Sequence, residues 1–447
     1  MIKASPVSRR VGEGVLFFFV RNFWFFLLFS AIILSVILNK QVPLIRSVQV
    51  NDPWPSSRQF DHTADSVAVV VQLSDTHIND YDGPQASVCL FSSSSLNSFF
   101  LFFLISLRKN KQDLRKWCMN ALPAIAPSLI LLSGDIVNSN YTRSPFQTAQ
   151  SVLQWRTYNE IRSNCSRIWN ASWQEVRGNH DLYGYDDVSY WYPGNYTSAG
   201  SDIYKMARPV SVSTKSGITH TFVMMESNMK EIYWPSMLGG GIPSLVSEVR
   251  PILQNLKSNG IPRIGVSHHP LNLITERAMF SDLLSELGED KLSFHLSGHL
   301  HKIIYTRHGE GTVELVANTF KDRAYRVIVF DNGMMSFTDD AILHQWPVIV
   351  LTTPKPAAYI SSDEPLSLMK SSRVIRAAVF SDSPILVVNA SVDGQLHCQL
   401  SHIGASPIWS CPWNTDSVSS GLHSIEIIAA DSKGNIKRIT EQVSLDG

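Results

Sequence analysis

The stretch from Ser66 to Asp75, SVAVVVQLSD, decides the fold of this chain. Its continuous apolar, β-branched run predicts a strand that is buried on both faces, and polar residues follow it directly. Four segments repeat the pattern: PSLILLSGD ending at Asp135, WQEVRGNHD ending at Asp181, IPRIGVSHHP ending at Pro270 and KLSFHLSGHLH ending at His301. Helices are predicted between them, at Gln147–Ile161, Ser244–Leu256 and Thr275–Leu287. Strands that alternate with helices indicate a layered α/β core.

The chain changes character towards its C-terminus. The segment Thr312–Asp340 predicts consecutive strands with a turn at Asn332-Gly333, so part of the sheet is expected to be antiparallel. After Pro347 come short alternating strands with Asp-Gly and Gly-Asn turns and no helical period. We therefore predict an all-β, immunoglobulin-like sandwich over residues 346–447, joined to the α/β domain through the proline-rich stretch Thr352–Tyr359.

Side chains suited to metal binding follow all five predicted strands. Residues two apart in an extended segment project to the same side, so such pairs can act together. Carboxylate, imidazole and amide donors suit divalent Mn, Fe or Zn better than Ca or a thiolate site. One such motif alone is usually a turn or a cap, but five in succession indicate one shared site. The residues are Asp75 and His77, Asp135, Asn179 with His180 and Asp181, His268 with His269, and His299 with His301.

This order of motifs resembles the calcineurin-like metallophosphoesterases, whose pattern is DxH, GD, GNH(D/E), H and GHxH. The resemblance covers Ser66–Asp340, within a predicted catalytic domain of residues 66–345. It implies one metal ion on Asp75, His77, Asp135 and His301, and a second on Asp135, Asn179, His268 and His299. His268 is chosen over His269 because the family ligand stands two residues before the proline. The sandwich and a single anchor are most similar to the membrane-anchored transmembrane protein 62 group of that superfamily.

The resemblance implies a two-metal hydrolase of phosphoesters. Two divalent ions would lower the pKa of a bridging water, and the resulting hydroxide would attack phosphorus. His180 would donate a proton to the leaving oxygen as general acid, and Asp181 would orient it, unless Asp181 is only a helix cap. Asn138 stands where purple acid phosphatases carry a tyrosine, which argues against a tyrosinate-bound ferric ion. The alternative function is a catalytically impaired lumenal or cell-surface protein that binds a protein partner through the sandwich.

The N-terminus predicts a membrane anchor. After a basic tail (residues 1–14), the run Val15–Leu38 is broken only by Arg21 and Asn22 and is long enough to span a bilayer as a signal anchor. A cleaved signal peptide competes with this interpretation, although no cleavage pattern follows. A stem (residues 39–65) then leads to the catalytic domain, expected on the lumenal or extracellular side.

Other features of the sequence agree with export but do not require it. Five glycosylation sequons begin at Asn140, Asn164, Asn170, Asn195 and Asn389. Among the five cysteines, Cys398 and Cys411 are close enough in sequence to form a bridge. The 38 basic and 38 acidic residues balance, so no recruitment of nucleic acid is expected.

A second apolar stretch, residues 87–107 (SVCLFSSSSLNSFFLFFLISL), interrupts the catalytic domain. A membrane crossing there would separate Asp75 and His77 from Asp135, so the metal site and a span exclude each other. A buried helix is disfavoured by four consecutive serines and the absence of a helical stripe. The abundance of Phe, Ser and Leu, with T-rich or pyrimidine-rich codons, favours a translated intron, which a comparison of genomic DNA with junction-spanning cDNA would test.

Overall fold

The computed structural model describes residues 59–79, 110–141, 148–182, 192–228, 242–258, 262–276, 281–309, 311–415 and 418–444. The predicted tail (1–14), anchor (15–38), most of the stem (39–65) and the apolar insertion (87–107) lie outside them. In the part of the chain that is described, no helix combines the length and the apolar character that a bilayer crossing needs.

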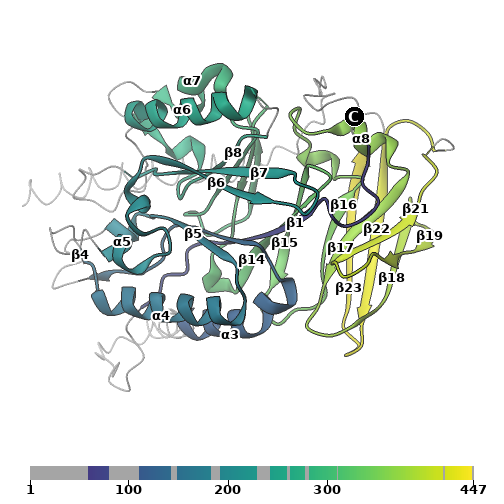
Figure 1. Cartoon of the computed structure of the whole chain (residues 1–447), viewed down its shortest axis with the longest axis horizontal. Helices are drawn as coiled ribbons and strands as arrows, with labels where there is room; N and C mark the ends of the chain where they lie inside the picture. Colours follow the sequence, from purple (N-terminus) through teal and green to yellow (C-terminus); the bar gives the residue numbers. More distant parts are fainter. Residues whose placement is uncertain are drawn as a thin grey trace, which may run out of the picture. The chain divides into compact units, whose positions relative to one another are not determined.

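Two sheets form the catalytic half, and all five predicted strands are present in them (Figure 1). The first sheet has the order β15-β14-β1-β2-β5, with β1, β2 and β5 parallel and β14 and β15 antiparallel. The second has the order β12-β13-β11-β8-β7-β6, in which β7, β8, β11 and β13 are parallel neighbours. The strands are β1 (Val67–Leu73), β2 (Leu129–Ser133), β5 (Ser172–Val176), β6 (Ala207–Ser213), β7 (Thr219–Met225), β8 (Ile264–Val266), β11 (Phe294–Ser297), β12 (Ile304–Arg307), β13 (Val313–Val316), β14 (Ala324–Asp331) and β15 (Met334–Ile342).

Strand β1 shows how the layers are held together. Successive side chains of a strand point to opposite faces, so Ala68 and Val70 enter an apolar core between the two sheets. Val69, Val71 and Leu73 enter a second core, under the helices α3 (Asn110–Ile125) and α4 (Val152–Ile168). The helices α6 (Ile242–Ser258) and α7 (Leu283–Leu287) cover the other sheet through a third core. The predicted layered α/β fold is confirmed.

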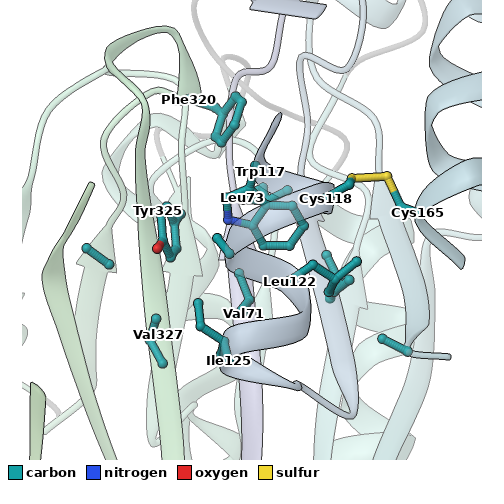
Figure 2. Packing of buried hydrophobic residues seen from close by; sticks show 14 of the residues in the cluster. Val71, Leu73, Trp117, Cys118, Leu122, Ile125, Cys165, Phe320, Tyr325 and Val327 are labelled. Carbon is teal, nitrogen blue, oxygen red and sulfur yellow. A yellow bond between two sulfur atoms is a disulfide. The ribbon is translucent and has the colours of Figure 1, made fainter. Parts of the chain in front are cut away.

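The core under α3 and α4 contains the disulfide Cys118–Cys165, which joins these helices (Figure 2). Trp117 of α3 lies edge-on to Tyr325 of β14, and both belong to the same core as Leu73 of β1. Sequence reasoning did not pair these cysteines, because they are 47 residues apart and only the fold brings the two helices together.

The C-terminal part of the chain, from β16 onward, is a β-sandwich, as predicted. One antiparallel sheet has the order β16-β17-β21-β20 and the other β19-β18-β22-β23, and their inner faces share one core. The expected bridge Cys398–Cys411 is present. The strands are β16 (Val348–Thr353), β17 (Val374–Phe380), β18 (Ile385–Val392), β19 (Gln395–Gln399), β20 (Ser401–His402), β21 (Ile408–Pro412), β22 (Leu422–Asp431) and β23 (Ile436–Ser444).

Strand β16 contributes side chains to the cores of both the α/β part and the sandwich. Val348 and Val350 lie in the core under α3 and α4, whereas Ile349 and Leu351 lie in the sandwich core. Nearby, the buried Arg376 of β17 pairs with the buried Asp331 of β14 at 3.1 Å. The sandwich is therefore packed directly on the catalytic half.

Two predicted helices were wrong in extent. For the predicted Gln147–Ile161, the helix α4 begins at Val152 and continues to Ile168, while Thr148–Ala149 form the short strand β4. The segment Thr275–Leu287 contains the short strands β9 (Thr275–Glu276) and β10 (Ser281–Asp282), and among its described residues only Leu283–Leu287 are helical. The two strands pair with each other, an interaction that helical periodicity does not reveal. The remaining short elements are β3 (Asn140–Tyr141), β4 (Thr148–Ala149), α5 (Tyr192–Tyr196), α8 (Leu366–Ser371) and the 3-10 turns His180–Leu182, Gly200–Tyr204, Leu271–Leu273, Gly288–Asp290, Phe320–Asp322 and Ala357–Tyr359.

Candidate metal centre

The seven predicted metal ligands follow the carboxyl ends of β1, β2 and β5 in one sheet and of β8 and β11 in the other. The structure brings all seven together, in two groups. In the first group Nε2 of His301 lies 3.1 Å from Oδ1 of Asp75 and 3.3 Å from Nε2 of His77. Nε2 of His77 lies 3.5 Å from Oδ2 of Asp135. This is the set Asp75, His77, Asp135 and His301, which can enclose one ion.

The second group lies on the other oxygen of Asp135. Oδ1 of Asp135 is 3.4 Å from Nε2 of His268. That nitrogen is 3.0 Å from Oδ1 of Asn179 and 3.1 Å from Nδ1 of His299. Asp135 therefore offers one oxygen to each group.

The chemistry of these donors fits metal ions better than it fits hydrogen bonding within each group. Nδ1 of His268 can only donate to the carbonyl oxygen of Ser133, 2.9 Å away, so in the neutral ring Nε2 carries the lone pair. Nδ1 of His77 faces Oδ1 of Asn138 at 3.1 Å in the same way. Donors bound to one ion at roughly 2.1 Å stand about 3.0 Å apart in octahedral and 3.4 Å apart in tetrahedral geometry. The separations of 3.0 to 3.5 Å lie close to these values, and that between Nε2 of His77 and Oδ1 of Asp75 is longer, at 3.9 Å, so the residues present fit two divalent ions.

Burial and neighbouring charges act in opposite directions on the pKa values of these ligands. Burial lowers the pKa of His268, but the carboxylates of Asp135 and Asp75 outweigh it and raise that pKa. Burial likewise opposes the charged form of Asp135, yet His268 and the neighbouring histidines hold the pKa of Asp135 far below its usual range. Since imidazole binds metal only when deprotonated, affinity at this site should fall as pH falls.

The backbone at the ligands is unusual. Positive φ angles occur at Asp75 (54°), His77 (43°), Asp135 (51°), His299 (70°) and His301 (53°). Residues other than glycine rarely adopt this left-handed region, and such strain concentrates at functional sites. Five of the seven candidate ligands thus have a left-handed backbone conformation.

Glycines are required where loops approach the ligands. A Cβ on Gly134, which has φ +84°, would stand 2.5 Å from Nδ1 of His268. A Cβ on Gly178 would stand 2.8 Å from Cγ of Asp135, and nearer still to its carboxylate oxygen. Neither position has room for a side chain.

His180 lies beside the first group with its ring partly exposed. Its Nδ1 lies 2.8 Å from the carbonyl oxygen of Asn138, and its backbone N–H donates to Oδ1 of Asp135 at 2.9 Å. Nε2 is 4.0 Å from Oδ2 of Asp135. Because the carbonyl can only accept, Nδ1 carries a proton and Nε2 is the atom that gains or loses one.

The predicted role of Asp181 differs from its observed contacts. Its carboxylate accepts from the backbone N–H groups of Ile136 (3.1 Å), Val137 (3.0 Å) and Gly178 (2.8 Å). It thus ties the loop after β2 to the loop after β5, whereas the carbonyl of Asn138 orients His180. Burial and the negative charge of Asp135 raise the pKa of Asp181 to about 7.

A sixth strand end supports the site and was missed in the sequence. Strand β7 ends in Glu226-Ser227-Asn228, the same apolar-to-polar pattern as the other five. Oγ of Ser227 lies 3.0 Å from Nδ1 of His269, whose donor atoms lie within 4.8 Å of those of His268 and His299. Asn228 and Glu226 bind Arg177, the residue just before Gly178.

Glu314 of β13, also missed, holds the loop that carries His268. One carboxylate oxygen accepts from the N–H of Leu271 at 2.6 Å and lies 3.2 Å from Nδ1 of His295. Nε2 of His295 is 2.9 Å from Oγ of Ser267. Burial alone would raise the pKa of Glu314, but His295 and His308 lower it to about 2. The loop Ser267–Leu271 is therefore fixed at both ends by one ionised carboxylate.

The fold and this arrangement define the class of protein. Residues 68–303, more than half of the chain, match the calcineurin-like phosphoesterases, and the chain belongs to this family. It is similar to Transmembrane protein 62 of Mus musculus, with 26% identity over 402 residues. That match covers 88% of this chain but only 57% of the relative, so the chain spans little more than half of the relative's length.

Two solved structures are also similar. One is a dimetal phosphatase from Danio rerio, with 12% identity and a TM-score of 0.39, covering 61% of this chain and 95% of that one. The other is a purple acid phosphatase from yellow lupin (Lupinus luteus), with 14% identity and a TM-score of 0.35, covering 62% of this chain and 53% of that one. Likenesses at this level carry no argument about substrates.

Proposed function

We propose that this chain is a metal-dependent hydrolase of phosphoesters that works with two divalent ions. The observation that carries the proposal is the double use of Asp135, whose two oxygens face two separate groups of donors. Membership of the calcineurin-like phosphoesterases supports the same activity. The complete set of donors also favours an enzyme over the alternative, an impaired protein that acts only through the sandwich.

Each residue has a distinct task in this proposal. When bound, two divalent ions lower the pKa of a water and stabilise the charge that develops on the phosphoryl oxygens. Asp135 fixes the spacing of the two positions. His180 is the general acid: Nδ1 stays bonded to the carbonyl of Asn138, and Nε2 delivers its proton to the leaving oxygen. Asp181 keeps Gly178 and the residues after Asp135 in register, which positions the ligands on both loops.

The test uses the full chain, stripped of metal with a chelator and then reloaded with Mn, Fe or Zn. Metal content and turnover of an aryl phosphate monoester and diester are measured together. For Asp135→Asn we expect loss of metal from both positions and loss of turnover, because one carboxylate serves both. Asp65→Asn, which changes an exposed aspartate, is the matched control and should behave as wild type. Two bound ions and normal turnover in Asp135→Asn would show that Asp135 is not the bridge.

We further propose that residues 15–38 anchor the chain in a membrane and that the catalytic domain (66–345) and the sandwich (346–447) face a lumenal or extracellular space. Disulfides persist in oxidising compartments, and two are present, in separate halves of the chain. The name of the mouse relative, Transmembrane protein 62, agrees with membrane attachment. Among the sequon asparagines, Asn164, Asn170 and Asn195 are exposed and could carry glycans.

The proposed topology is tested with sealed microsomes. Protease should leave the catalytic domain intact until detergent is added, and an N-glycosidase should increase its mobility on a denaturing gel. Digestion of the domain without detergent would place it on the cytosolic side and contradict the proposal.

A further inference from the structure

The sheet β19-β18-β22-β23 of the sandwich has an outer face with exposed apolar side chains. Val388 and Ala390 of β18 and Ile427 of β22 enter the sandwich core, so the residues between them point outward. Next to these outward residues, Leu396 of β19 is 72% exposed and Ile436 of β23 is 70% exposed. Apolar side chains on an exposed surface indicate an interaction site or a risk of aggregation, unless something covers them.

Asn389 stands in the middle of this outer face. It lies between the inward residues Val388 and Ala390, and its cross-strand neighbours are Ile428 of β22 and Gln399 of β19. Its side chain is half-buried and makes no hydrogen bond with any residue that the structure describes. The amide nitrogen of Asn389 is therefore not committed to the protein.

Asn389 is also the first residue of the sequon Asn389-Ala390-Ser391. Residues two apart in a strand share a face, so Ser391 lies on the outer face as well. Ala390, between them, pairs across the sheet with Cys398, which forms the disulfide with Cys411. Disulfides persist in the oxidising compartments through which exported proteins pass, and glycans are attached to sequons of exported proteins. The disulfide and the sequon thus indicate the same compartment.

We propose that Asn389 carries an N-linked glycan and that this glycan covers the apolar side chains of the outer face. The inference rests on the proposed lumenal or extracellular location of the sandwich. With neighbouring strands about 4.8 Å apart and a rise of about 3.3 Å per residue, the Cα of Leu396 lies about 8 Å from that of Asn389, and the Cα of Ile436 about 12 Å from it. Since a glycan is bulky and solubilising, one glycan at Asn389 reaches both side chains.

The modification is a glycosyl transfer from an oligosaccharide that is linked to a lipid diphosphate. The amide nitrogen of Asn389 attacks the anomeric carbon of the oligosaccharide, a C–N bond forms and the C–O bond to the diphosphate breaks. The amide loses one proton, and the lipid diphosphate leaves. Transfer to the chain before it folds needs no access to the finished strand, so the folded sheet has only to leave room on its outer face. The exposure of Leu396 and Ile436 shows that this room exists.

The first test is mass spectrometry of the full chain produced in eukaryotic cells. Peptides that contain Asn389 are compared before and after treatment with an N-glycosidase, which converts a glycosylated asparagine to aspartate. We expect a glycan on Asn389 in most molecules. Ser391→Ala removes the sequon and should abolish the modification, whereas the matched control Ser391→Thr keeps the sequon and should retain it. An unmodified Asn389 in wild type would overturn the inference and leave the outer face open to a protein partner.

The second test asks whether the glycan covers the outer face. Hydroxyl-radical footprinting of the folded protein measures the oxidation of single side chains. Oxidation of Leu396 and Ile436 should rise in Ser391→Ala, and also in folded wild type after removal of the glycan, but not in Ser391→Thr. Leu422 is the internal control: it is 49% exposed but lies about 20 Å from Asn389 along β22, so its oxidation should change much less. Equal oxidation of Leu396 and Ile436 with and without the glycan would show that the glycan does not cover them.

Failure of this inference is distinguishable from failure of the proposed location. If no sequon is modified and protease digests the catalytic domain in sealed microsomes without detergent, the proposed location fails and the inference fails with it. If Asn164, Asn170 or Asn195 carries a glycan and Asn389 does not, the location stands and only the inference on Asn389 fails.

Discussion

Gly178→Ala should damage the metal centre without changing any ligand. Gly178 lies in the loop after β5, and its N–H donates to Oδ2 of Asp181 at 2.8 Å. The new Cβ would stand 2.8 Å from Cγ of Asp135, whereas ordinary contacts begin at 3.4 Å. The difference, 3.4 − 2.8 = 0.6 Å, is the least by which the two loops must separate at this atom.

This displacement is large on the scale of a functional site, since such sites tolerate errors of about 0.5 Å. It moves the carboxylate of Asp135, which serves both ions in the proposed function, so we expect both ions to be affected. We expect metal affinity to fall roughly 10- to 100-fold, as when residues supporting metal ligands are lost. We also expect kcat, measured at saturating metal, to fall by about 10²-fold, the cost of a misplacement near 1 Å.

Metal affinity is measured by competition with a chelating dye, and kcat with an aryl phosphate. Gly309→Ala is the control, because a Cβ there would meet nothing within 4 Å. Circular dichroism separates a displaced loop from a protein that does not fold. Gly178→Ala with wild-type metal affinity would refute the reasoning, because the loops would then have room that the structure does not show.

Three further predictions concern other parts of the chain. His180→Gln should keep its metal but lose about 10²–10⁴-fold in kcat, with a smaller loss on substrates with good leaving groups; an equal loss on all of them would indicate a structural role. The pKa of Glu314 is lowered from 4.5 to about 2. The ionised carboxylate therefore contributes fully to the stability of the folded protein above pH 4.5, and this contribution is lost as the pH falls towards 2. Chemical denaturation should therefore find Glu314→Gln about 3 kcal/mol less stable at pH 7, with a gap that narrows below pH 4.5; a gap independent of pH contradicts this. A chain that starts near Asp52 and lacks residues 88–107 should fold, bind two ions and be more soluble than the chain that contains them, and unfolding of that variant would show that the segment is native structure.

The sequence predicted the strands and the strand ends at which the candidate ligands lie, because both depend on local information. A buried parallel strand appears as a continuous apolar run, and the residues that follow it reach the same sheet edge as those of its neighbours. Asp75 and His301 are 226 residues apart, yet each could be assigned to the same edge from the strand that precedes it.

The supporting contacts could not be predicted in this way. Glu314 binds Leu271 from 43 residues away, and only the pairing of β11 with β8 and β13 brings them together. Asp181 could be placed near the site, but its acceptance of three backbone N–H groups depends on the shape of two loops. The end of a strand can be recognised from the residues around it, whereas the residues that hold the ligand loops in place can be recognised only from the tertiary structure.

The two-sided strand β16 limits how this protein can be divided. Although composition changes sharply near residue 346, the strand that follows gives Val348 and Val350 to one core and Ile349 and Leu351 to the other. Separating the halves would leave one of them without part of its interior, and Asp331 or Arg376 without its partner. The boundary near residue 346 thus marks the point where the α/β fold gives way to the all-β sandwich, and it is not a flexible linker between two separate domains. Replacing the sandwich by another domain would therefore expose part of the core under α3 and α4 unless the new domain supplied the equivalents of Val348 and Val350.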